Sequence, residues 1–177
     1  MILVESGASE AEIRGYGASA LRELVRVDDW LPDVYAHPST DQPRQYLLYA
    51  DARHRFSVVS FVLGPGLQTP IHDHKVWGLI GVLRGWECMT SYALDSTGVL
   101  RQAGDEVHHI AGDVDAVSPA IGDIHQVRNA YTDRASVSIH VYGANIGTVH
   151  RSIYLADGVS KPFVSSYANS TLPNLWT

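Results

Sequence analysis

Two histidines separated by one residue, His72 and His74, are the first part of the sequence whose residue types and spacing suit chemistry. They lie among apolar residues in a region that otherwise has the pattern of a β-strand, so both imidazoles are expected on one face of a sheet. Two neutral nitrogen ligands on one face make half of a metal site. Because His-x-His also occurs on solvated strands, the metal interpretation depends on a third ligand.

A third histidine, His125, lies in another expected strand directly after a turn at Gly122. Three histidines without a carboxylate suit a divalent iron site with open positions, but imidazole is also compatible with zinc, copper or nickel. The three residues therefore predict a metal site and leave the metal open.

Ser138, His140 and Tyr142 alternate along one expected strand, so their side chains face the same side. Burying three polar side chains costs free energy unless they hydrogen-bond to one another. These three can do so, each with the next along the strand. The alternative is an edge strand with all three side chains in solvent.

Short β runs separated by turn residues must position these groups, and they predict an all-β sandwich or barrel. The 177 residues, 45% of them hydrophobic, suit a single domain. We expect a helical part at about 1–36, a barrel at about 44–145 and an irregular C-terminal wrap at about 146–177. The expected strands are 46–49, 56–63, 77–83, 87–92, 107–110, 115–117, 123–127 and 135–141.

The N-terminal part has the strongest helical signal, in two pieces. Ser9 and Glu12 fit a capping box, and apolar residues recur at helical spacing after Ser19. We expect a break around Gly15 and Gly17 and an end at Pro32. The helices should pack outside the sheet.

The composition limits the classes of molecule that this protein is expected to bind. The net charge of -6 and the lack of a Lys/Arg cluster argue against nucleic acid. No apolar run reaches the roughly 20 residues that span a bilayer, so no membrane partner is expected. The single cysteine, Cys88, allows no internal disulfide, and cytoplasm is the default location.

The two histidine segments together resemble the two motifs of the cupin superfamily, a jelly-roll-like small β-barrel with His-x-His on one strand and a further His on another. Gly66 precedes His72 by six residues, and Gly85 follows Gly78 by seven. The Glu ligand of most cupins has no counterpart here. With Ser138, His140 and Tyr142, the pattern over about 30–167 is similar to the thiol dioxygenase family, which includes cysteine dioxygenase and 3-mercaptopropionate dioxygenase.

This resemblance implies that His72, His74 and His125 hold Fe(II), and that a small thiol and O2 react there to give a sulfinic acid without an organic cofactor. It also implies that the Tyr142 hydroxyl ends a relay from Ser138 through His140, where it can hydrogen-bond the substrate or oxygen. Gly78 occupies the position of the cysteine that crosslinks to the tyrosine in mammalian-type members. We therefore expect no crosslink to Tyr142, and Cys88 as an ordinary core thiol.

Substrate choice in this family depends on a strand before the first histidine motif, where cysteine-specific members carry an arginine. The alignment places Gln45 there, with Arg44 as the alternative, and a glutamine resembles the bacterial members that prefer 3-mercaptopropionate. Arg151 matches an arginine of these Gln-type members and is the candidate for holding the substrate carboxylate. The alternative for Arg151 is a solvated surface side chain.

The remaining polar residues are expected to be structural. Asp73 should point away from the metal, and Trp77 should pack in the core. Five histidines have no other candidate metal ligand at a matching spacing. They are interpreted as surface or structural residues: His37, His54, His108, His109 and His150. Other functions compatible with the sequence are cysteine oxidation, a non-catalytic metal-binding cupin for a small acidic ligand, and an isomerase or another oxygenase on the same barrel. The sequence leaves the oligomeric state open.

Overall fold

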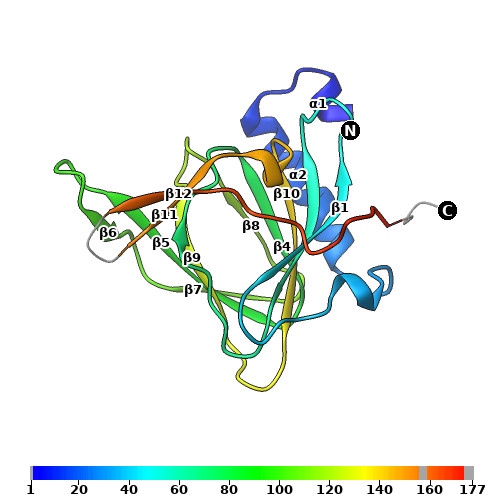
Figure 1. Ribbon diagram of the computed structural model, residues 1–177. Coiled ribbons are helices and arrows are strands. Elements are labelled where there is room, and N and C mark those ends of the chain that lie inside the picture. Colours follow the sequence, from blue (N-terminus) through cyan, green and yellow to red (C-terminus); the bar gives the residue numbers. More distant parts are fainter. Residues whose placement is uncertain (1, 156–158, 174–177) are drawn as a thin grey trace.

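Two curled antiparallel sheets face each other in the computed structural model, which describes residues 2–155 and 159–173 (Figure 1). The first sheet has the strand order β1 (Arg44–Ala50), β2 (Ser57–Leu63), β10 (Ser136–Tyr142), β4 (Gly78–Arg84) and β8 (Val114–Val117). The second has the order β12 (Ser160–Phe163), β11 (Arg151–Tyr154), β3 (Ile71–His72), β9 (Ile124–Asn129), β5 (Trp86–Leu94) and β6 (Leu100–Gln102), with β7 (Val107–Ile110) also paired to β5.

The predicted all-β fold and its eight expected strands are confirmed, with strand ends that differ by at most two residues. The sequence analysis expected a strand around His72 but gave no bounds for β3, and it missed β6, β11 and β12. All four have four residues or fewer, so alternation within them is a weak signal.

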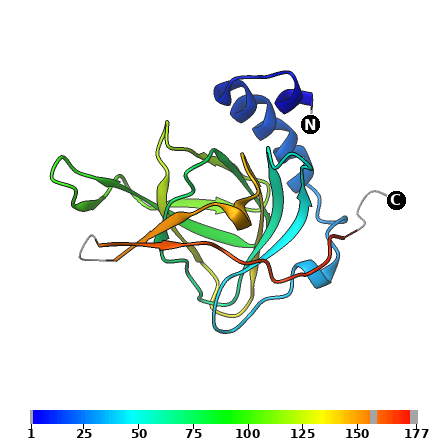
Figure 2. The ribbon, with the colours of Figure 1, turned by 45° about the horizontal axis from the view of Figure 1, so that its top comes forward.

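The central strand β10 is buried on both faces, and this explains its alternating chemistry. Val137 and Ile139 pack on the outer side, in a cluster with Leu21 and Val25 of the helix α2 (Glu10–Val25). Successive side chains of a strand point to opposite faces, so Ser138, His140 and Tyr142 point into the barrel. Figure 2 shows the helix outside the barrel, as expected.

The helical part differs from the prediction first at its two glycines. The capping box of Ser9 and Glu12 is present, but α2 runs without a break through Gly15 and Gly17. A Cβ on Gly17 would lie 2.8 Å from Leu79 Cδ1 of β4, so the glycine lets the helix approach the sheet closely. Packing against the sheet thus outweighs the low helix propensity of glycine.

The N-terminal region contains two further short elements and an earlier helix end than expected. A short helix α1 (Ile2–Glu5) comes first, α2 ends at Val25 instead of at Pro32, and Pro32 precedes the 3-10 turn η1 (Asp33–Tyr35). Among the described residues, neither α-helix has the length and apolar character needed to cross a bilayer.

The C-terminal part is more regular than predicted. After the 3-10 turn η2 (Ile146–Thr148), β11 and β12 form an antiparallel pair that extends the second sheet through β3. The chain then returns along β1 (Figure 1), where Asn169 accepts from the Leu47 N–H and donates to its carbonyl. The expectation of an irregular wrap is therefore wrong for 151–154 and 160–163, and at 156–158 and 174–177 it lies outside the described residues.

Candidate metal centre and pocket

The adjacent strands β3 and β9 bring two of the three predicted ligands side by side. His72 and His125 are direct cross-strand partners, and His74 follows β3 in a loop. The possible ligand atoms of the three side chains all lie within 4.8 Å of one another. The structure therefore brings the three predicted residues together, although the expectation that His74 continues the strand is wrong.

Hydrogen bonds orient these imidazoles. Nδ1 of His72 lies 2.9 Å from the Pro70 carbonyl oxygen, and Nδ1 of His74 lies 3.1 Å from Asp123 Oδ1. Nδ1 of His125 lies 3.1 Å from the sulfur of Met89. A ring that donates from Nδ1 keeps the lone pair on Nε2, which is the atom left to bind a metal.

The electrostatic setting keeps these ligands neutral. Burial lowers the pKa of His72 to about 4 and the pKa values of His74 and His125 well below the usual value. Neutral imidazole is the form that binds metal ions. Nε2 of His74 is buried and has no hydrogen-bond partner in the described part of the chain. Such an atom fits a divalent transition-metal ion, which would satisfy its lone pair.

Asp123 supports the centre and was not assigned a role from the sequence. Its carboxylate accepts hydrogen bonds from the backbone N–H groups of His74 and Lys75 as well as from the His74 ring. Burial raises the pKa of Asp123, and these N–H donors oppose the shift. Its place two residues before His125 was the available signal, but spacing alone does not show that it would reach His74.

Asp73 points away from the three histidines, as expected. Its carboxylate accepts from the Ser152 N–H at 2.7 Å and from the Tyr154 hydroxyl at 2.8 Å, and it pairs with Lys75 Nζ at 2.7 Å. These contacts join the loop after β3 to β11. Asp73 thus fixes the backbone between His72 and His74.

The row on β10 forms the hydrogen bonds that the sequence allowed. Ser138 Oγ lies 2.8 Å from Nε2 of His140, and Nδ1 of His140 lies 2.7 Å from the Tyr142 hydroxyl. Because β10 lies between β2 and β4 and all three side chains are buried, the edge-strand alternative is wrong. The Tyr142 ring stacks on the His74 ring at 5.4 Å between centroids, so the row ends beside the predicted metal ligands.

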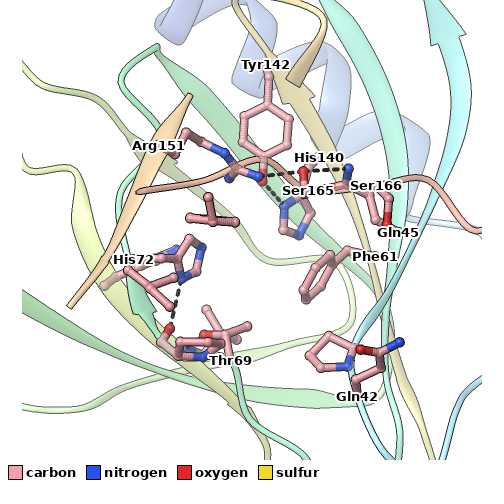
Figure 3. A pocket seen from close by; sticks show the side chains of 16 residues that line it. Gln42, Gln45, Phe61, Thr69, His72, His140, Tyr142, Arg151, Ser165 and Ser166 are labelled. Atoms are coloured by element: carbon pink, nitrogen blue, oxygen red, sulfur yellow. Dashed lines mark hydrogen bonds between the residues drawn. The ribbon is translucent and has the colours of Figure 1, made fainter. Parts of the chain in front are cut away.

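A cavity of about 370 Å³ connects these groups, which is a size typical of small-molecule sites. Its lining includes His72, His125, His140 and Tyr142 (Figure 3). Gln45 also lines it, whereas Arg44 directs its guanidinium to the Tyr46 hydroxyl at 3.4 Å. Of the two candidates on this strand, the structure thus brings Gln45 to the pocket.

Arg151 lines the same cavity and is 4% exposed, so the solvated-surface alternative is wrong. Its Nη2 donates to Ser165 Oγ at 2.6 Å, and its guanidinium lies 4.6 Å above the Phe163 ring. Figure 3 shows Ser165 between Arg151 and Gln45, whose Nε2 donates to the same oxygen at 3.2 Å. Within residues 2–155 and 159–173, no carboxylate pairs with Arg151 and its buried Nε has no partner.

Gly78 packs against Tyr142, whereas Trp77 is half-buried and not in the core, contrary to the expectation. Gly78 faces Tyr142 across β4 and β10, and a Cβ on it would lie 3.0 Å from the tyrosine ring. Trp77 packs over Gly143, which has no Cβ to clash with the indole, and it does not line this cavity. Cys88 is a buried free thiol on β5.

A second group of metal-binding residue types lies outside the barrel and includes one histidine that had no partner in the sequence analysis. Cys88, Glu106 and His108 place their ligand atoms within 4.8 Å of one another. The Arg128 guanidinium pairs with Glu106 at 2.7 Å and brings a positive charge to the same place. Of the other four histidines, His37, His54 and His150 are exposed, and His109 pairs with Asp115 at 3.4 Å.

No family profile matches the chain. Its structure is similar to a conserved protein with a double-stranded β-helix domain from Klebsiella pneumoniae, at 20% identity over 72% of this chain and 90% of that chain, with a TM-score of 0.51. It is also similar to a cupin superfamily protein from Desulfitobacterium hafniense, at 12% identity over 68% and 96% of the two chains, with a TM-score of 0.48. The chain therefore has a double-stranded β-helix fold, with a candidate three-histidine metal site inside the barrel.

Proposed function

We propose that this protein is a non-haem Fe(II) thiol dioxygenase that oxidises a small thiol carboxylate to its sulfinic acid. The preferred substrate is 3-mercaptopropionate, which gives 3-sulfinopropionate. One observation carries the proposal: two of three clustered histidines, the Tyr142 end of a hydrogen-bonded row and the buried Arg151 line one cavity, and in the described part of the chain Arg151 has no carboxylate partner.

His72, His74 and His125 are the residues that would hold the iron. Bound Fe(II) supplies the redox centre at which the thiol sulfur and both atoms of O2 combine. The chain supports this centre by fixing the ring orientations, through the Pro70 carbonyl for His72 and through Asp123 for His74. Fixed ligands that need no reorganisation favour metal retention.

Arg151 binds the substrate carboxylate in this proposal. A guanidinium presents several donors in one plane and can grip a carboxylate through two of them. Ser165 occupies one nitrogen, and the buried Nε still lacks an acceptor among the described residues. A carboxylate from the substrate would supply that acceptor and neutralise the buried charge.

The pocket favours a thiol acid without an amine. Among its lining residues in the described part of the chain, Arg151 is charged and none is a carboxylate. The ammonium of L-cysteine would be desolvated near a fixed cation without a counter-charge, which is unfavourable. L-Cysteine is therefore the poorer substrate, with oxidation to cysteine sulfinate as the alternative reaction.

Tyr142 acts on the reacting groups through its hydroxyl. Its hydrogen bond to His140 and the stacking of its ring on His74 hold the oxygen at the inner end of the cavity. Burial raises the pKa of Tyr142, so the hydroxyl keeps its proton. It can therefore donate a hydrogen bond to the substrate or to oxygen during the reaction.

Oxygen consumption by the iron-loaded full chain tests this proposal. We expect uptake with 3-mercaptopropionate, a higher kcat/KM for it than for L-cysteine, and sulfinate as the product by mass spectrometry. The zinc-loaded protein and His74→Ala serve as controls, and both should consume no oxygen. Stoichiometric iron binding without oxygen uptake on any thiol would instead indicate a non-catalytic cupin that binds a small acid.

A further inference from the structure

The segment at 163–169, which begins at the end of β12 and is called the strap below, carries a serine to the pocket. The side chains of every second residue of the strap are half-buried: Phe163, Ser165, Tyr167 and Asn169. The residues between them are exposed, as in an extended chain with one face on the protein. The Ala168 N–H donates to the Gln45 carbonyl at 2.8 Å, so the strap is held along β1.

Ser165 accepts two hydrogen bonds through its hydroxyl oxygen. Oγ lies 2.6 Å from Arg151 Nη2 and 3.2 Å from Gln45 Nε2 (Figure 3). A guanidinium nitrogen and an amide NH2 group can only donate, so the serine oxygen is the acceptor in both contacts. These two bonds occupy both lone pairs of the hydroxyl oxygen.

The hydroxyl proton of Ser165 is left for a third partner, because a hydroxyl has one proton besides its two lone pairs. Within residues 2–155 and 159–173, no carbonyl or carboxylate oxygen accepts from this hydroxyl. Ser165 lines the cavity together with Arg151 and Gln45. An acceptor for its proton therefore has to come from the cavity.

Arg151 needs an acceptor at the same place. Its Nε is buried and has no partner among the described residues, and it belongs to the guanidinium whose Nη2 donates to Ser165. A carboxylate has two oxygens that both accept. A carboxylate that accepts from Nε with one oxygen can accept from the Ser165 hydroxyl with the other. The two donors thus suit one carboxylate better than they suit a neutral or cationic group.

We propose that Ser165 is a substrate-binding residue, whose hydroxyl donates to the substrate carboxylate beside Arg151 and makes the strap part of the site that selects thiol acids. The identity of the thiol rests on the proposed function. Gln45 is a positioning residue in this arrangement, because its amide occupies the second lone pair of Ser165 and leaves the proton for the cavity. An ammonium group in the same place would meet donors without an acceptor.

Binding without reaction tests this role. The zinc-loaded full chain would be titrated by calorimetry with 3-mercaptopropionate and with 1-propanethiol, which has the same number of carbon atoms and no carboxylate. Zinc has no redox chemistry, so the measurement does not depend on thiol oxidation. Ser165→Ala loses a hydrogen bond to a charged group, so its affinity for 3-mercaptopropionate should fall about tenfold or more. Its affinity for 1-propanethiol should stay within about twofold.

An equal loss of affinity for both thiols in Ser165→Ala, or no loss for either, would overturn the proposal. Ser165→Thr keeps the hydroxyl and should bind 3-mercaptopropionate within about threefold of the wild type. Ser170→Ala is the matched control. This serine is exposed, lies beyond the strap and does not line the cavity, so the variant should bind both thiols like the wild type.

Ser165→Asp distinguishes a direct contact with the substrate from an effect through Arg151. The new carboxylate would hold the guanidinium at least as well as the serine does, but it carries no proton to donate. It would also compete with the substrate carboxylate for Arg151. We expect its affinity for 3-mercaptopropionate to be at least about tenfold lower than that of Ser165→Ala. Recovery of the wild-type affinity would show that Ser165 only positions Arg151.

The outcomes separate this inference from the proposed function. A wild type that prefers 3-mercaptopropionate to 1-propanethiol, with the same preference in Ser165→Ala, would overturn only the role of Ser165. Acid binding that depends on Ser165 in a protein whose iron-loaded form consumes no oxygen would overturn only the dioxygenase proposal. A wild type that binds the two thiols equally well would overturn both the role of Ser165 and the proposed preference for a thiol acid.

Discussion

Asp123 holds His74 at two points and the next residue at a third: its carboxylate accepts from the His74 ring Nδ1 at 3.1 Å, from the His74 backbone N–H at 3.1 Å and from the Lys75 N–H at 2.9 Å. His74 lies in a loop, so no strand pairing fixes it as β3 and β9 fix His72 and His125. The Asp123 carboxylate thus takes the place of the strand-pairing hydrogen bonds that His74 lacks. It also leaves Nε2 as the free ring nitrogen.

Asp123→Asn should therefore weaken metal binding without unfolding the barrel. Loss of such a supporting carboxylate typically lowers metal affinity or activity about 10- to 100-fold, and we expect this range here. Competition with a chelator measures the affinity. Asp133→Asn, at an exposed carboxylate that pairs with Arg134, is the control and should bind metal like the wild type. Equal affinities of the two variants would show that Asp123 does not support the ligand.

Arg151→Gln should impair substrates that carry a carboxylate. Removing one partner of a buried, hydrogen-bonded charge pair costs about 2 kcal/mol or more, so kcat/KM for 3-mercaptopropionate should fall about 30-fold or more. A thiol of similar size without a carboxylate should show little change. Steady-state oxygen uptake with both thiols provides the comparison, and an equal loss for both would assign Arg151 a structural role.

Tyr142→Phe should retain iron and slow turnover. The variant removes one buried hydroxyl, whose hydrogen bond is worth about 1–2 kcal/mol, so kcat should fall roughly 5- to 30-fold. Tyr46→Phe is the matched control, because its buried hydroxyl donates to the His37 carbonyl at 2.7 Å, away from the cavity. Iron content and kcat measured together distinguish the two. An unchanged kcat in Tyr142→Phe would make the row on β10 structural.

Glu87 should make folding stability depend on pH. Burial raises its pKa from 4.5 to about 7, so between these pH values the folded protein keeps a proton that the unfolded chain has released. The free energy of unfolding therefore falls as the pH rises through this window, by about 3 kcal/mol for a shift of this size. Glu87→Gln lacks this dependence, so its stability relative to the wild type should increase with pH.

Urea unfolding of the metal-free proteins below pH 4.5 and above pH 7 measures this difference. Glu106→Gln is the control of opposite sign, because the hydrogen bonds from Arg128 lower the pKa of that carboxylate. Its contribution to stability is present above the unfolded pKa and is lost as the pH falls. A stability difference for Glu87→Gln that stays constant with pH would mean that its carboxyl is not shifted.

Local rules predicted the parts of the structure that depend on neighbouring residues. The capping box at Ser9 fixed the start of α2, and the alternation of Ser138, His140 and Tyr142 predicted their common face and their hydrogen bonds. The three candidate ligands also came from the sequence, through two motifs that a cupin barrel brings together. In each case the information lies within a few residues or in a recurring pattern.

Contacts between distant segments were not predictable in the same way. From the sequence alone, Gly17 is expected to interrupt a helix. The fold shows its role, because the missing side chain lets α2 pack against Leu79 of β4. Asp123 and Glu87 look like ordinary strand-end and strand residues, because their partners His74 and Ser136 each lie 49 residues away in the chain. The pair β11 and β12 was missed because its strands are short and are ordered by pairing, β12 with β11 and β11 with β3.

The fate of the oxygen atoms tests the central claim most directly. The iron-loaded protein would be given 3-mercaptopropionate under isotope-labelled dioxygen, and the sulfinate product would be analysed by mass spectrometry. A thiol dioxygenase predicts that both sulfinate oxygen atoms carry the label, with one O2 consumed for each product molecule. Product with a single labelled oxygen, or disulfide in place of sulfinate, would contradict the account.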